Sequence, residues 1–138
     1  MKLKLKIITP KKIVHEEEVN AITVPSVDGE VTILPRHTHF FCLLKEGILT
    51  YKGDGIDDSL AIGGGYLETD GKEVRVLVSR AYGQDEIDRE LTEKALQDAQ
   101  QLLKEATDTK QRAEATALLR KSVIDMRLIK RRTRNTSV

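Results

Sequence analysis

Polar and apolar residues alternate along the first part of the chain with a period of two, which is typical of half-buried β-strands. Residues 2–8, Lys-Leu-Lys-Leu-Lys-Ile-Ile, show this alternation most clearly. A second short strand is predicted around Ile13 and Val14. It should lead through an acidic corner at residues 16–18 into a third strand at residues 19–24.

Asp28-Gly29 predicts a tight turn, because glycine adopts positive φ without steric cost and aspartate hydrogen-bonds its own backbone. Val24 and residues 31–34 should therefore pair antiparallel across this turn. Pro35 should end the second of these strands, since proline has no N–H to donate to a ladder.

Residues 40–44 form a continuous apolar run that is short enough to be a fully buried strand. Residues 47–52 are its expected hairpin partner, and residues 53–58 should form a polar loop. Asp70-Gly71 predicts another hairpin turn. The remaining strands are predicted at residues 60–62, 66–68 and 74–78. Short strands with turns about every 8 to 12 residues indicate an antiparallel sandwich or barrel.

The pattern changes at Asp85, beyond which the sequence has no Gly or Pro and is rich in good helix formers. Asp85 is the predicted N-cap of a first helix. Glu86 and Asp88 follow in the first turn, where acidic side chains favour the helix dipole. The apolar stripe of this helix is expected to comprise Leu91, Ala95, Ala99, Leu102 and Ala106.

A break is predicted at residues 107–110, with Asp108 or Thr109 capping a second helix. The second apolar stripe is expected to comprise Ala115, Leu119, Val123, Met126 and Ile129. Two amphipathic helices joined by so short a loop fold back as an antiparallel hairpin. Alanine buries little area, at about 0.8 kcal/mol per buried CH₂, so this seam should be weakly held and able to open.

These patterns predict two domains. Residues 1–84 should form an antiparallel β-sandwich, and residues 85–138 should form a two-helix antiparallel hairpin. The polar residues 133–138 are expected to fray.

Charge is balanced over the whole chain but not within it. The 23 Lys and Arg residues against 22 Asp and Glu residues give a formal net charge of +1, so no general attraction to nucleic acid is implied. Residues 120–134 are basic, with Asp125 as their one acid. The run indicates a solvated helix face or a contact for a partner. Nucleic acid is not expected, because the helices lack aromatic side chains for base stacking.

No apolar stretch approaches the ~20 residues that span a bilayer, and the first residues alternate rather than forming the core of a signal peptide. Cys42 is the single cysteine, cannot form an internal disulfide and is expected to be a small buried hydrophobe. We expect a reducing aqueous compartment, with any membrane association passing through another protein.

Candidates for site chemistry are few. His37 and His39 have the spacing of two strand residues on one face, but no acidic or cysteine cluster completes a four-ligand metal site. The glycines at residues 63–65 lack the Lys and the following helix of a phosphate-binding loop, and they indicate a bulge or tight bend. No catalytic set of side chains is recognised, so we expect neither a metal, nor a cofactor, nor independent catalysis.

Four segments in register resemble the epsilon subunit of the F-type ATP synthase. They are residues 24–37 (Val-Pro-Ser-Val-Asp-Gly-Glu-Val-Thr-Ile-Leu-Pro-Arg-His), 44–49, 62–68 and 74–81. The resemblance implies a non-catalytic rotor subunit of the central stalk. Its sandwich would bind the gamma subunit and the c-ring, so that proton-driven rotation drives ATP synthesis at the alpha and beta subunits. It also implies a peripheral place on the cytoplasmic face of a bacterial plasma membrane.

The resemblance also implies roles for individual residues. Glu30 and His37 match positions at the end of the sandwich that meets the c-ring. Lys121, Arg127 and Arg131 lie in the stretch that approaches acidic loops of the beta subunits when the helices extend, which inhibits ATP hydrolysis. At physiological ionic strength such attraction is screened beyond about 8 Å, so it acts only at close range.

Some relatives in this family bind ATP through a motif that begins Ile/Leu-Asp and ends Arg-Ala. Ile87-Asp88 matches its start, but Leu91 and Thr92 stand at its end, and leucine cannot replace a guanidinium on a phosphate. The groups to test for ATP binding are Glu86, Ile87, Asp88, Arg89 and Arg112. The competing function is a stand-alone sandwich whose basic helical tail docks an acidic protein or RNA.

Overall fold

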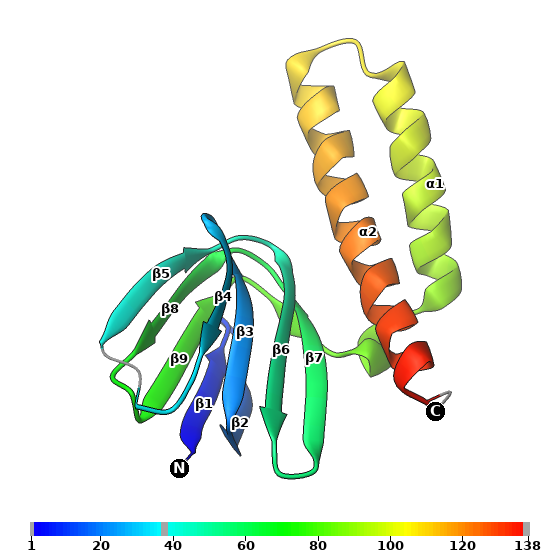
Figure 1. Ribbon diagram of the computed structural model, residues 1–138. Helices are drawn as coiled ribbons and strands as arrows, with labels where there is room; N and C mark the ends of the chain where they lie inside the picture. The colour runs from blue at the N-terminus through cyan, green and yellow to red at the C-terminus, as the bar shows by residue number, and fades with distance from the viewer. Residues whose placement is uncertain (1, 37–38, 137–138) are drawn as a thin grey trace. The chain divides into compact units, whose positions relative to one another are not determined.

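A computed structural model describes residues 2–36 and 39–136 of the chain, with side chains up to Arg131. The chain divides into two compact units, Met1–Gly83 and Gln84–Val138. The first unit consists of strands and the second of helices (Figure 1). No helix in the described part of the chain is both long and apolar enough to cross a membrane.

The described residues of the first unit form ten strands. They are β1 (Leu3–Ile8), β2 (Ile13–Val19), β3 (Ala21–Ser26), β4 (Gly29–Ile33), β5 (Phe40–Leu44), β6 (Gly47–Gly53), β7 (Ile56–Ile62), β8 (Gly65–Thr69), β9 (Glu73–Val78) and β10 (Ala81–Tyr82). Hydrogen bonds link them in the order β10-β7-β6-β3-β5-β8-β9-β1-β2, with β4 on β3. The sheet folds over on itself around one apolar core (Figure 1). The predicted β-sandwich is confirmed, except that β1 and β9 pair in parallel.

Alternation along β1 decides its orientation, as predicted. Leu3, Leu5 and Ile7 are fully buried, whereas Lys4 is exposed. The turn at Asp28-Gly29 is also confirmed: Val24 pairs with Val31, and Gly29 has a φ of 126°. The hydroxyl of Ser26 closes this turn by accepting a hydrogen bond from the Asp28 N–H.

The predicted acidic corner at residues 16–18 is wrong, because these residues lie inside β2. Two of them face the lysines of β1: Glu18 is opposite Lys4 in the ladder, and Glu16 forms an ion pair with Lys4 at 3.2 Å. Opposite charges on paired strands stabilise the pairing, so the acidic run continues the strand and the corner falls at Asn20.

The predicted hairpin between residues 40–44 and 47–52 is also wrong. β5 pairs with β8, and β6 pairs with β3 and β7. Nor is β5 fully buried, because Phe41 and Leu43 are 58% and 54% exposed. Cys42, between them, is half-buried, and burial raises the pKa of its thiol. The predicted polar loop at residues 53–58 shrinks to a two-residue turn, Asp54-Gly55.

The second unit contains a 3₁₀ turn, η1 (Gln84–Glu86), and two helices, α1 (Arg89–Glu105) and α2 (Thr109–Thr136), packed as the predicted hairpin. The N-cap of α1 is Asp88 and not Asp85, because Asp85 lies in η1. The Asp88 carboxylate accepts the Leu91 N–H at 3.0 Å. Asp108 caps α2 in the same way, accepting the Gln111 N–H at 2.7 Å.

The buried face of α1 differs from the predicted stripe. Ala99 is buried as expected, but Leu91 and Leu102 are 65% and 50% exposed, and Thr92 is buried instead. The Thr92 hydroxyl donates to the Asp88 carbonyl oxygen at 2.8 Å, which satisfies its polar group and lets threonine face inward. On α2, Ala115 and Ile129 are buried as predicted.

Candidate functional site

An apolar row crosses the outer face of five strands. Strand register sets it, because directly paired residues point to the same side of a sheet. Leu43 is opposite Tyr66, Tyr66 is opposite Leu77, Leu77 is opposite Ile8, and Ile8 is opposite Ile13. We call these five residues, from β5, β8, β9, β1 and β2, the apolar row.

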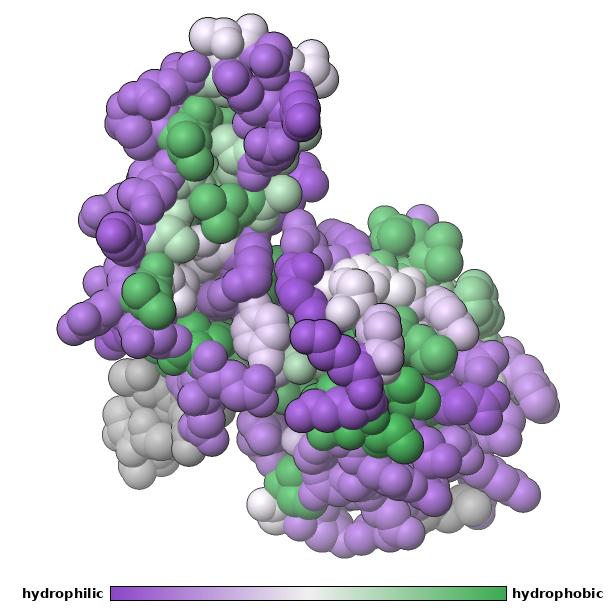
Figure 2. All heavy atoms as spheres, turned by 180° about the vertical axis from the view of Figure 1, so that it is seen from behind, coloured by the Kyte–Doolittle hydropathy of each residue, from purple (hydrophilic) through white to green (hydrophobic). Residues whose placement is uncertain are grey.

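The ends of the apolar row are open to solvent. Leu43 and Ile13 are 54% and 56% exposed. Phe41, one step along β5, is 58% exposed and lies with its ring centroid 5.4 Å from that of Tyr66. In Figure 2, hydrophobic residues interrupt the mostly hydrophilic surface of the strand-rich unit. Exposed apolar patches are common where proteins contact one another, which makes the apolar row a candidate contact surface.

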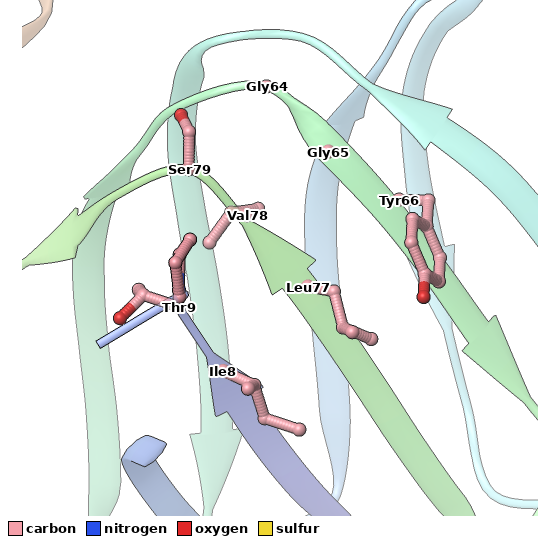
Figure 3. Close-up of a pocket in the computed structure, with 9 residues that line it drawn as sticks. Ile8, Thr9, Gly64, Gly65, Tyr66, Leu77, Val78 and Ser79 are labelled. Carbon is pink, nitrogen blue, oxygen red and sulfur yellow. The ribbon is translucent and has the colours of Figure 1, made fainter. Parts of the chain in front are cut away.

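A shallow depression of about 430 Å³ lies beside the centre of the apolar row. The side chains of Ile8, Leu77 and Tyr66 project from three adjacent strands along it, as Figure 3 shows. Gly64 and Gly65 form part of its wall at the start of β8. Its lining is almost entirely apolar, so it suits an apolar side chain of a partner rather than a phosphate or a metal ion.

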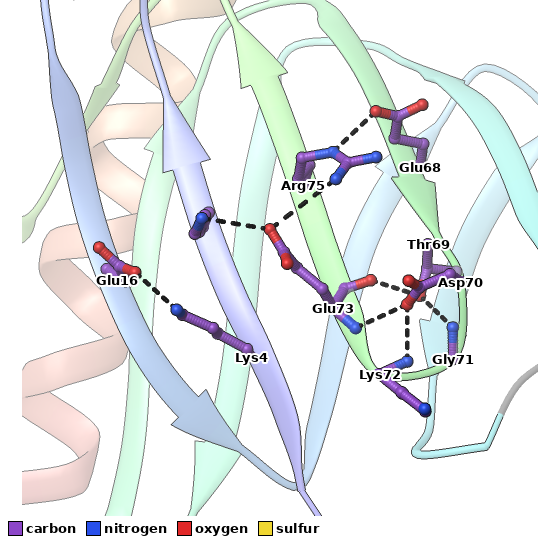
Figure 4. Close-up of polar contacts among 10 residues, drawn as sticks. Lys4, Glu16, Glu68, Thr69, Asp70, Gly71, Lys72, Glu73 and Arg75 are labelled. Carbon is purple, nitrogen blue, oxygen red and sulfur yellow. Dashed lines mark hydrogen bonds and ion pairs between the residues drawn. The ribbon is translucent and has the colours of Figure 1, made fainter.

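Charged residues form the next row along the same strands (Figure 4). Arg75 on β9 pairs with Glu68 on β8 at 2.8 Å, and the hydrogen bond that Arg75 donates to the Glu68 carboxylate raises the pKa of the Arg75 guanidinium. Lys6 on β1 pairs with Glu73 at 3.3 Å. Ion pairs that solvent reaches, as these are, contribute about 0–1 kcal/mol each. They give the face a polar border that contains both positive and negative side chains.

Asp70 orders the turn that connects β8 and β9. Its carboxylate accepts the backbone N–H groups of Lys72 and Glu73, each at 2.9 Å (Figure 4). The bonds from Glu73 and Lys72 lower the pKa of Asp70 below its usual range. The charged carboxylate therefore caps this turn down to a lower pH than an ordinary aspartate would.

Of the two residues expected to face a c-ring, Glu30 lies in the described part of the chain, in β4. Glu30 is exposed and follows the β3–β4 turn, beside Val27, which is 54% exposed. His37 lies outside the described residues, four positions beyond the end of β4 at Ile33. Seven residues of chain, about 3.3 Å each where extended, separate His37 from Glu30. The contact predicted for His37 therefore stays a prediction.

Lys121, Arg127 and Arg131, predicted to contact a beta subunit, are exposed on α2. Lys121 is engaged within the helix, because its Nζ lies 3.1 Å from Oδ2 of Asp125. The Asp125 side chain is only 6% exposed. Lys121 therefore satisfies a buried carboxylate in this state, while Arg127 and Arg131 extend the basic face.

The candidate ATP-binding residues do not form one site in this structure. Glu86, Ile87, Asp88 and Arg89 precede or begin α1, whereas Arg112 lies in the first turn of α2. Because the helices are antiparallel, these positions are near opposite ends of the hairpin (Figure 1). Asp88 is occupied as the N-cap, and the Arg89 Nε lies 3.4 Å from the Glu93 carboxylate.

We therefore expect no saturable binding of ATP to the isolated chain at about millimolar nucleotide. Asp88 and Arg89 have intramolecular partners, and Leu91 stands where a phosphate-binding guanidinium would be needed. Isothermal titration with ATP and Mg²⁺ measures this directly. A saturable heat that disappears in Arg89→Ala would contradict the expectation.

Residues 2–36 and 39–136 gather no group of three or more His, Cys, Asp or Glu side chains that could hold a metal ion. His15 lies beside Glu17 at 2.6 Å and against the ring of Tyr51. The surface suited to function is accordingly the apolar row.

Comparison with known proteins gives the family. A family model described as "ATP synthase, Delta/Epsilon chain, beta-sandwich domain" matches residues 2–84. An ATP synthase epsilon chain of Herpetosiphon aurantiacus is 35% identical over 132 residues, covering 96% of this chain and 97% of the relative. The chain belongs to the ATP synthase epsilon chain family. The epsilon chain of Geotalea uraniireducens is 45% identical over 103 residues, 75% of each chain.

Solved structures carry the same fold as this epsilon-family chain. A chain in the structure of Euglena gracilis mitochondrial ATP synthase, OSCP/F1/c-ring, superposes with a TM-score of 0.78 at 26% identity. That match covers 86% of this chain and 75% of that one. A chain from the Tetrahymena thermophila mitochondrial ATP synthase central stalk/c-ring has a TM-score of 0.63 at 18% identity, which shows the shared fold alone.

The resemblance read from the four segments is confirmed by these matches. The alternative of a stand-alone module for an acidic protein or RNA loses its basis, because the similarity to an epsilon chain runs almost from end to end. Sequence reasoning missed the apolar row. Its five residues come from five segments, and only the strand register places them side by side.

Proposed function

We propose that this chain is a non-catalytic subunit of the central stalk of an F-type ATP synthase, where it links a c-ring to a gamma subunit. The observation that carries the proposal is 35% identity to an ATP synthase epsilon chain over 96% of this chain and 97% of the relative. A similar chain in a structure described as OSCP/F1/c-ring supports it. The subunit would lie at a membrane surface and be held there by its partners.

Within this proposal the gamma subunit covers the apolar row. Exposed leucine and aromatic side chains are costly in water, and interfaces concentrate such residues at their centre with polar residues around them. Leu43 and Phe41 are more than half exposed, and the ion pairs of Arg75 and Lys6 border the row. This is the composition expected of a permanent contact between subunits.

The c-ring contact is proposed at the β3–β4 turn. Glu30 and Val27 present an acidic and an apolar side chain there, both exposed. Ser26 and Gly29 fix the shape of the turn, so these side chains have a rigid base. A ring contact of His37 stays a prediction.

We also propose that α2 inhibits ATP hydrolysis by placing Arg127 and Arg131 against acidic loops of a beta subunit. The double variant Arg127→Ala/Arg131→Ala should hydrolyse ATP about three- to tenfold faster in the assembled enzyme, since exposed charge pairs contribute up to about 1 kcal/mol each. The increase should shrink as salt is added, because salt screens such pairs.

Lys104→Ala/Lys94→Ala is the matched control for this experiment, since it removes two exposed charges from α1 and leaves α2 intact. Lys121 is unsuitable as a test, because its removal would leave the buried Asp125 carboxylate without this partner. Equal hydrolysis rates for the α2 variant and the wild-type enzyme would argue that the basic face is only solvated.

Co-expression tests the assignment as a whole. A tagged copy of this chain should recover the gamma subunit of the same organism in a one-to-one ratio, and with it the alpha and beta subunits. Recovery of the chain by itself, with gamma expressed and soluble, would reject the central-stalk assignment.

A further inference from the structure

The side chain of Gln84 joins the start of the helical unit to a distant part of its last helix. Its Nε2 donates hydrogen bonds to the carbonyl oxygens of Ile129 at 2.7 Å and of Leu128 at 3.4 Å. Gln84 begins η1, and η1 is held in shape by a bond from the Ile87 N–H to the Gln84 carbonyl oxygen at 3.1 Å. One carboxamide thus fixes α2 to a short rigid turn.

The oxygen of this carboxamide is in an unfavourable environment. Gln84 Oε1 is buried and accepts no hydrogen bond from any described residue. Exchanging the two amide atoms would not help, because it would turn Oε1 toward two carbonyl oxygens. Burying an unpaired carbonyl oxygen costs free energy, because the oxygen loses its hydrogen bonds to water. When the contact opens, water can bond to the oxygen again and this cost is removed. The closed contact is therefore less stable than its two hydrogen bonds alone would make it.

We propose that Gln84 is a clasp that holds α2 against η1 and sets how often the helical hairpin opens. Apolar burial also holds α2, since Leu128 and Ile129 are buried together with the smaller Ala99 and Ala115, and the clasp adds two directional hydrogen bonds to this burial. The clasp is formed by residues of this chain alone and needs no partner subunit. Its effect on ATP hydrolysis rests on the proposed function.

Gln84→Glu tests the clasp, because its effect should be reversed when the new carboxylate is protonated at lower pH. At about pH 8 a carboxylate would face the carbonyl oxygens of Ile129 and Leu128, so the contact should break. We expect the α2 amides near Ile129 to exchange with deuterium about tenfold faster than in the wild-type chain. At about pH 4.5 the carboxyl is protonated and donates its O–H to Ile129, so the ratio to wild type should fall below about threefold.

Two further variants complete the test. Gln84→Ala removes the donor without adding charge, and it should raise exchange near Ile129 about fivefold with the same ratio at both pH values. Gln100→Glu makes the same chemical change at an exposed position of α1 and should leave this exchange unchanged. Helical circular dichroism shows whether the variants keep their helices.

The proposal is overturned if Gln84→Glu and Gln84→Ala both exchange at the wild-type rate, or if Gln84→Glu is equally fast at both pH values. It is also overturned if Gln100→Glu has the same effect. Because exchange is measured on the isolated full chain, its outcome is independent of assembly. The exchange result could support the clasp while the assembled enzyme with the Gln84 variants hydrolyses ATP at the wild-type rate. That combination would keep the clasp proposal and reject the proposed inhibitory role of α2.

Discussion

Replacing Leu43 by Asp should weaken the association with the gamma subunit at least about 30-fold. Leu43 lies at the open end of the apolar row, opposite Tyr66 and one step from Phe41. A carboxylate there would have to be buried without a cationic partner when the apolar row is covered. Truncation of an interface residue that carries binding energy costs about 2 kcal/mol or more, and adding an unpaired charge increases this loss. Titration of labelled chain with purified gamma measures the change.

Leu34→Asp provides a matched control. Leu34 is 54% exposed, as is Leu43, and it lies after β4 rather than in the apolar row. The same substitution at equal exposure should therefore change the affinity less than about threefold, and both variants should unfold at similar temperatures. If Leu34→Asp weakens binding as much as Leu43→Asp does, the apolar row is not the contact surface.

Local patterns were sufficient for most elements of this fold. The alternation in residues 2–8 predicted β1, and Asp28-Gly29 predicted the turn that pairs Val24 with Val31. These predictions succeeded because each depends on neighbours in sequence. The partner of β5 does not, and the short Lys45-Glu46 connection suggested a hairpin with β6. The Lys45 N–H instead bonds the Pro25 carbonyl oxygen, and β5 continues along β8.

The face of α1 illustrates an ambiguity that periodicity cannot resolve. Leu91 and Thr92 lie four and three residues before Ala95, so either one shares a helix face with it. Hydrophobicity favoured Leu91. The structure buries Thr92, whose hydroxyl is satisfied by the Asp88 carbonyl oxygen. Capping at Asp88, three residues later than predicted, belongs to the same local arrangement.

The candidate site was only partly accessible from sequence. Resemblance to a family supplied Glu30 and His37, which lie in the recognised segment 24–37, and the basic residues of α2, which lie in its helical tail. The apolar row carries no such signature. Its central members, Tyr66 and Leu77, belong to segments recognised for other reasons, and a sheet register is needed to see that they are neighbours. Tertiary pairing, rather than local preference, creates this surface.

The pairing of β8 with β5 and β9 is the basis of the second large prediction, which concerns Gly65. This glycine opposes Leu44 on one side and Val78 on the other. An ideal Cβ at Gly65 would collide with the Leu77 carbonyl oxygen and lie 2.8 Å from the Val78 Cα. Those atoms are backbone in a paired strand and cannot yield as a side chain would. Gly65→Ala should therefore lower the free energy of unfolding by about 3 kcal/mol, at the upper end of overpacking effects.

Gly64→Ala separates this clash from the general cost of replacing a glycine. A Cβ at Gly64 would meet only the Leu44 carbonyl oxygen, at an ordinary 3.5 Å. Its unfolding free energy should therefore stay within about 1 kcal/mol of the wild-type value, since alanine also restricts the unfolded chain. Urea unfolding of both variants measures the difference. Equal midpoints for Gly65→Ala and Gly64→Ala would show that β8 shifts to accept a methyl group. The depression beside Tyr66 and Leu77 would then be adaptable rather than preformed.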